Sequence, residues 1–146
     1  MQMPRPNPDV LMRKAELVRR LHAFLPSDSV ISDPVETKAY ECDGLSAYRC
    51  PPMAAVLPRS TQEVAAVLKL CHEMNVPVVP RGAGTSLAGG ALPTADSLIL
   101  GVARMNDVLE TDYENRVIKV QTGRTNLNVT GAVEAQGFFY APDPSS

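Results

Sequence analysis

Hydrophobic residues recur at helical spacing in two stretches of this chain. In residues 9–25 the apolar positions fall near one face, which predicts an amphipathic helix that Asn7 or Asp9 can cap and that Pro26 follows. In residues 61–75 a similar stripe follows Ser60, whose hydroxyl stands at capping-box spacing from Glu63. The two apolar faces consist of Val10, Leu11, Val18, Leu21 and Leu25, and of Val64, Val67, Leu68 and Cys71.

Short apolar runs without helical spacing predict the strands. They occupy residues 54–57, 76–79 and 97–102, and two further runs at 108–110 and 116–121 flank the polar turn 112–115. Because the second helix lies between the first two runs, we expect a strand–helix–strand unit with a parallel pair of strands and a right-handed crossover. A short helix from Asp33 to Tyr40 is also expected, as is one that Thr125 or Asn126 caps and that runs to about residue 136, where Gly137 suits the C-terminal cap.

Composition removes several function classes. The chain has 146 residues, of which 45% are hydrophobic and 21% charged, with a net charge of −2 and no tryptophan. These values give no basis for a nucleic-acid partner, and no apolar run approaches the roughly 20 residues of a membrane span. The N-terminus lacks the apolar core of a secretory signal, so we expect a cytoplasmic protein.

Metal and disulfide sites are not expected either. The cysteines Cys42, Cys50 and Cys71 are odd in number and have no C-x-x-C spacing, which argues against a disulfide framework or a zinc site. Cys71 lies within a helical apolar stripe and is expected to be a buried, inert thiol. Neither His22 nor His72 is expected to bind a metal.

The chemistry is concentrated between Pro80 and Ala91. Four glycines, two hydroxyls and one arginine stand in this stretch, directly after an apolar run. Glycines let another molecule approach the main chain, and a run of inward-turned amides forms an anion-binding concavity. Thr85 and Ser86 add hydroxyl donors, and Arg81 adds a charge suited to phosphate. We therefore predict a diphosphate cradle, with a ligand-free connector, or an Arg81 paired with a carboxylate, as the alternatives.

The two common nucleotide motifs do not occur in this stretch. The pattern G-x-G-x-x-G would need glycine where Leu87 stands, and the P-loop would need lysine and a hydroxyl where Gly90 and Ala91 stand. Residues 78–90 resemble instead the pyrophosphate loop of the vanillyl-alcohol-oxidase/PCMH-type FAD-binding domain. The stretches 104–106, 120–123 and 140–146 match it too, in the same order and separations. The resemblance covers most of the chain from about Ile31 and is strongest to the glycolate oxidase FAD-linked subunits and the D-lactate and D-2-hydroxyglutarate dehydrogenases.

This resemblance implies an α+β fold. A small parallel strand–helix subdomain would extend to about residue 90 and be followed by part of a mainly antiparallel subdomain with helices. Residues 1–50 would form a helical lead-in, and residues 51–146 the PCMH-type FAD-binding domain, incomplete at its C-terminus.

The resemblance also implies FAD as the cofactor. The implied cofactor-binding residues are Arg81, Gly82, Ala83, Gly84, Thr85, Ser86, Gly89, Gly90, Gly123, Pro142, Asp143 and Ser145. Besides Arg81, two of them have alternatives, because Asp143 can cap its own turn and Gly123 can mark a strand end. Thr85 stands where some members carry the histidine that binds flavin covalently, so non-covalent FAD is expected.

The implied activity is that of an oxidoreductase. It would transfer a hydride from C2 of a small 2-hydroxy acid, glycolate or D-lactate, to FAD. No catalytic residue is assigned, because in the family the substrate-facing residues lie in a region that this sequence does not contain. An iron–sulfur electron-transfer subunit is a partner that the resemblance allows. A non-catalytic nucleotide-binding module and an inactive truncated fragment stand as alternatives.

Overall fold

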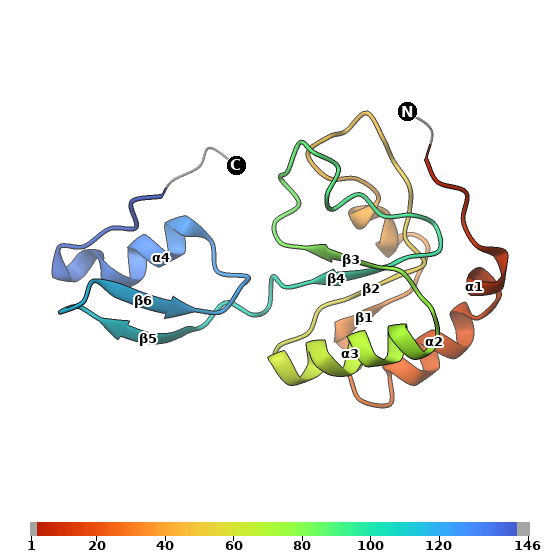
Figure 1. The fold of residues 1–146 in the computed structure, drawn as a ribbon, viewed down its shortest axis with the longest axis horizontal. Helices are drawn as coiled ribbons and strands as arrows, with labels where there is room; N and C mark the ends of the chain where they lie inside the picture. The colour runs from red at the N-terminus through yellow and green to blue at the C-terminus, as the bar shows by residue number, and fades with distance from the viewer. Residues whose placement is uncertain (1–2, 143–146) are drawn as a thin grey trace.

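The computed structural model describes residues 3–142, and its largest element is a four-stranded sheet (Figure 1). The strands are β1 (Val30–Ile31), β2 (Ala54–Val56), β3 (Val78–Arg81) and β4 (Leu98–Gly101), in the order β1-β2-β4-β3. The strand β4 is parallel to both β2 and β3, whereas β1 pairs antiparallel with β2. The carboxyl ends of three parallel strands therefore meet at one edge of the sheet.

Two features of this sheet correct the sequence predictions. The strands before and after the second helix are parallel, as expected, but they are not neighbours, because β4 lies between them. Residues 98–101 consequently belong to the parallel subdomain, and its predicted end near residue 90 was too early. The strand β3 also begins two residues later than predicted, at Val78, because the Val76 amide still bonds to the Cys71 carbonyl at the helix end (2.8 Å).

Three α-helices complete this part of the molecule, which we call the sheet unit. They are α1 (Pro8–Met12), α2 (Lys14–Leu21) and α3 (Thr61–Glu73), and α2 and α3 lie side by side on one face of the sheet (Figure 1). Their apolar stripes and the inner strands enclose one core cluster. Its most buried members include Leu17, Leu21, Ala54, Val56, Val67 and Leu98, each at 0% exposure.

The helix starts follow the predicted caps. The Asn7 side chain accepts from the Asp9 amide (3.0 Å), and Ser60 Oγ accepts from the Glu63 amide (3.2 Å). The single helix predicted over residues 9–25 is instead broken at Arg13. There the Asp9 carbonyl accepts from the Arg13 side chain (3.0 Å), and the Arg13 amide bonds one residue later, to Val10 (3.1 Å), which ends α1.

The second part, which we call the hairpin unit, follows the sheet unit through one connection. It contains the antiparallel strands β5 (Val108–Asp112) and β6 (Val117–Val120), then α4 (Asn126–Val133) (Figure 1). Thr125 caps α4, and the chain leaves through a 3-10 turn, Glu134–Gln136, to Gly137 at φ +79°. The expected hairpin, helix and glycine cap are therefore confirmed.

Two further 3-10 turns, Ser27–Ser29 and Glu36–Tyr40, link α2 to β1 and β1 to β2. Asp33 precedes the second turn, and its Oδ1 accepts from the Val35 amide (2.7 Å) and from the Glu36 amide (3.3 Å). No helix within residues 3–142 has both the length and the apolarity to cross a bilayer.

Candidate functional site

The predicted cradle forms the loop that leaves β3 at the carboxyl edge of the sheet. The last ladder bond before the loop runs from the Val102 amide to the Arg81 carbonyl (3.0 Å). Residues 82–97 then connect β3 to the adjacent, parallel β4. The glycine loop, residues 82–90, is thus held at the edge where ligands of open α/β sheets commonly bind.

The main-chain amides of this loop are largely free. Within residues 3–142, the amides of residues 82–87, 89 and 90 donate no hydrogen bond to the protein, and the Ala88 amide donates to Ser86 Oγ (3.2 Å). Most of these residues are exposed. A row of unpaired N–H groups on glycine-rich backbone is the composition of an anion-binding concavity.

The glycines of the loop fall into two groups. Gly84 and Gly89 have φ of +73° and +76°, a conformation that other residues rarely adopt, so the loop itself requires them. Gly82 and Gly90 do not have positive φ, and a Cβ built on either would meet nothing within 4 Å. Nothing within residues 3–142 therefore explains glycine at those two positions, whereas close approach of a ligand would.

Arg81, at the base of the loop, has partners within the protein. Its Nη1 donates to the Cys42 carbonyl (2.7 Å), and its guanidinium carbon stands 5.8 Å from the centroid of the Tyr40 ring. A Cβ on Gly84 would collide with the same guanidinium. Arg81 thus bonds to a main-chain carbonyl, and within residues 3–142 it pairs with no carboxylate.

The remaining predicted contacts lie outside the loop. The Gly123 amide donates to the Met105 carbonyl (2.8 Å), and a Cβ there would come within 2.9 Å of that oxygen, so local packing accounts for the glycine. Pro142 is exposed near the end of the described chain. Asp143 and Ser145 lie outside the described residues.

Sequence reasoning missed two residues that contact the glycine loop, Asp43 and Gly44. The Asp43 side chain is buried and accepts from the Ala91 amide (3.4 Å), and Gly44 lies against the carbonyls of Thr85 and Ser86. The Asp-Gly pair was an available sign of a tight turn, but nothing in the sequence indicates which loop such a turn would contact.

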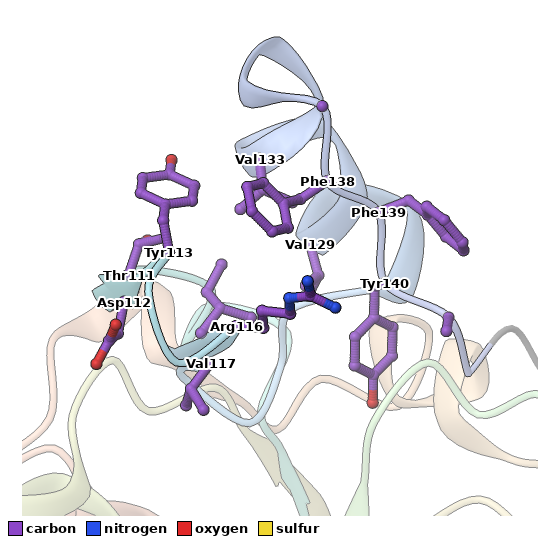
Figure 2. A pocket seen from close by; sticks show the side chains of 13 residues that line it. Thr111, Asp112, Tyr113, Arg116, Val117, Val129, Val133, Phe138, Phe139 and Tyr140 are labelled. Carbon is purple, nitrogen blue, oxygen red and sulfur yellow. The ribbon is translucent and has the colours of Figure 1, made fainter.

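A groove of about 530 Å³ lies elsewhere, in the hairpin unit between β5, β6 and α4 (Figure 2). Figure 2 shows the Arg116 side chain extending toward Tyr140, and the rings of Tyr113 and Phe138 are 5.4 Å apart. None of the predicted cofactor residues within residues 3–142 lines it. Residues 3–142 also contain no group of three His, Cys, Asp or Glu side chains placed to hold a metal ion.

The family model described as "FAD binding domain" matches residues 52–146, which is more than half of the chain. This chain belongs to the FAD binding domain family. The glycine loop is compatible with that cofactor, because its free amides suit a diphosphate and its two unconstrained glycines leave room for one. The expectation that FAD is the cofactor is therefore confirmed.

Two curated relatives of this FAD binding domain are oxidoreductases. The glycolate oxidase subunit GlcD of Escherichia coli K12 is 42% identical over 139 residues, which are 95% of this chain and 28% of that protein. The D-lactate dehydrogenase of Anaerostipes hadrus is 35% identical over 130 residues, 88% of this chain and 27% of that protein. The chain thus spans little more than a quarter of the length of these relatives.

Among solved structures, p-cresol methylhydroxylase with substrate bound has the same fold. It superposes with a TM-score of 0.78 at 22% identity, over 94% of this chain and 28% of that protein. This likeness confirms the expected PCMH-type α+β fold, in which a mixed sheet with parallel strands precedes an antiparallel pair.

Proposed function

We propose that this chain supplies the diphosphate-binding part of a flavoprotein that oxidises a small 2-hydroxy acid such as glycolate or D-lactate. The observation that carries the proposal is the pairing of free loop amides with two glycines, Gly82 and Gly90, that residues 3–142 do not themselves require. The substrate class is taken from the relatives GlcD and D-lactate dehydrogenase.

In this proposal the chain's own residues bind and orient rather than react. Main-chain amides of Gly82, Ala83, Gly84, Thr85, Ser86, Gly89 and Gly90 donate to the diphosphate of FAD, and Gly123, Pro142, Asp143 and Ser145 line the cofactor from other segments. When bound, FAD would supply the hydride acceptor for oxidation of the 2-hydroxy acid at C2 to the 2-oxo acid, a reaction that also releases the hydroxyl proton. We assign no catalytic residue.

Further parts of the proposal extend to the whole protein. FAD is held without a covalent bond, since Thr85 offers no imidazole. Residues 1–50 form a helical lead-in and residues 51–146 the FAD-binding domain proper. The protein acts in the cytoplasm, and an iron–sulfur subunit takes its electrons.

Gly82→Val tests the cradle more cleanly than a change at Gly84. A Cβ at Gly82 would meet nothing within 4 Å in residues 3–142, so valine there adds bulk on the loop surface, whereas valine at Gly84, with its positive φ, would strain the loop. We expect FAD affinity to fall by about 100-fold, or about 2.7 kcal/mol. Visible flavin absorbance and an FAD titration of the complete gene product measure this.

Gly131→Val is the matched control, because Gly131 also faces open space but lies in α4. It should retain FAD. Retention of normal flavin by Gly82→Val would reject the cradle. Bleaching of the wild-type flavin by glycolate or D-lactate would support the oxidase, whereas FAD binding without bleaching would favour a non-catalytic module.

A further inference from the structure

A segment that precedes the residues matched by the family model contacts the glycine loop and both residues that flank it, Arg81 and Ala91. This segment, residues 40–45, is called here the lead-in turn. Arg81 at the base of the loop donates to the Cys42 carbonyl (2.7 Å) and stands over the Tyr40 ring. These contacts join residues about 40 positions apart in the sequence.

The second contact is between backbones. A Cβ on Gly44 would lie 2.6 Å from the Thr85 carbonyl oxygen and 2.9 Å from that of Ser86. Both distances are below any that a real Cβ makes, and both neighbours are main-chain atoms of the loop tip. The lead-in turn can approach the tip this closely only because residue 44 is glycine.

The third contact is a buried carboxylate. Asp43 is 5% exposed, and it accepts through Oδ1 from the Leu45 amide (2.9 Å) and through Oδ2 from the Ala91 amide (3.4 Å). It thus fixes the turn and anchors the far end of the glycine loop with one side chain. Burial of a carboxylate is costly unless it is hydrogen-bonded, so this arrangement favours a single geometry of the two segments.

We propose that the lead-in turn is a positioning element that holds the glycine loop in its FAD-binding conformation, with Asp43 and Gly44 as its positioning residues. The proposal rests on the function proposed above. Glycine-rich backbone loses more conformational freedom on ordering than other backbone does. A loop that is already fixed at its base, tip and far end binds with less of that cost. Arg81 accordingly acts on FAD through the loop.

Asp43→Asn tests the proposal, because an electrostatic role and a positioning role for Asp43 predict opposite changes in FAD affinity. If Asp43 acted through its charge alone, the substitution would tighten FAD binding, because it removes a negative charge near the diphosphate. If Asp43 positions the loop, the substitution should weaken FAD binding. An asparagine that keeps the bond to the Leu45 amide presents its NH2 group to Ala91, and that group cannot accept a hydrogen bond. We expect the Kd for FAD to rise at least about tenfold, which is about 1.4 kcal/mol. The complete apoprotein is titrated with FAD, and flavin fluorescence is followed.

Gly44→Ala is the second variant and should weaken FAD by at least as much, because its methyl group displaces the loop tip. Hydrogen exchange of the Ala91 and Leu92 amides, which donate to Asp43 and to the Gly89 carbonyl, is measured alongside in the apoprotein, and both variants should speed it while α3 stays protected. Should Gly44→Ala fail to fold, Asp43→Asn decides the matter.

The outcomes separate the two proposals. If Gly82→Val loses FAD while Asp43→Asn binds it as tightly as the wild type or more tightly, the lead-in turn is not a positioning element and the cradle stands. If Gly82→Val itself keeps FAD, the diphosphate-cradle proposal is rejected, and the positioning proposal, which depends on it, is rejected too. Weaker FAD binding and faster loop exchange in Asp43→Asn would support both.

Discussion

The sheet unit and the hairpin unit bury their apolar side chains to very different extents. In β4 of the sheet unit, Leu98 and Ile99 are completely buried, and Leu100 is 5% exposed. In the hairpin unit, Leu109 and Val117 are 55% and 58% exposed, and Leu127 on α4 is 81% exposed. Since buried apolar area is the main source of stability, the sheet unit is expected to carry most of the free energy of unfolding. The glycine loop is attached to that unit.

The difference in burial bears on where a rigid ligand-binding loop can be attached. The loop that carries the free amides begins at β3 and returns to β4, a strand in which all four residues are buried. Segments with few buried apolar contacts open at lower free energy than core strands do. A diphosphate cradle on the hairpin unit would therefore open more often than one on the sheet unit.

The largest expected effect comes from the central strand. Leu98→Ala should lower the free energy of unfolding by about 2–5 kcal/mol, because it leaves a cavity between α3 and the sheet. Urea unfolding monitored by circular dichroism measures the change. A loss below about 1 kcal/mol would mean that the sheet unit does not dominate the stability.

Cys71 should give a smaller, pH-dependent effect. Burial raises the pKa of the Cys71 thiol from 9.0 to about 11. Between these values the unfolded state binds fewer protons than the folded state, so stability should fall as the pH rises from about 9 to 11. In Cys71→Ala this fall should be reduced, as urea unfolding across that pH range would show. An identical fall in both proteins would assign it to other groups.

The smallest effect is expected on the exposed side of the hairpin unit. Leu127→Gln should change the free energy of unfolding by no more than about 0.5 kcal/mol, because the side chain is already 81% exposed. The measurement is the same urea unfolding, with Leu98→Ala beside it. A loss comparable with that of Leu98→Ala would show that another part of the complete protein covers this surface.

Local elements could be predicted from sequence wherever the signal lay within a few residues. The Ser60 cap and the apolar stripe after it placed α3, and Gly137 marked the end of the last helical segment. The glycine loop could be proposed as a diphosphate cradle from sequence because its residue types carry that chemistry locally. The capping box was half correct, since the Glu63 carboxylate accepts from the Arg59 amide (2.7 Å) rather than from that of Ser60.

Long-range arrangement could not be predicted in the same way. The strand β1 has two residues, too few for a pattern, and it exists because Val30 and Ile31 pair with Val56 and Ala55. Nothing in residues 54–79 shows that a later strand will separate β2 from β3. Arg81 was expected to contact a phosphate, and its bond to Cys42 depends on a turn almost 40 residues away.

The place of β4 in the sheet has a consequence for synthesis on the ribosome. Residues 78–81 leave the exit tunnel before residues 98–101, and β3 has no pairing partner until β4 arrives, because β2 is not its neighbour. Domains form from the N-terminus as the chain emerges. The nascent glycine loop is therefore attached to an unpaired strand through the synthesis of residues 82–97, and its second end becomes fixed only when β4 has been translated and has joined the sheet.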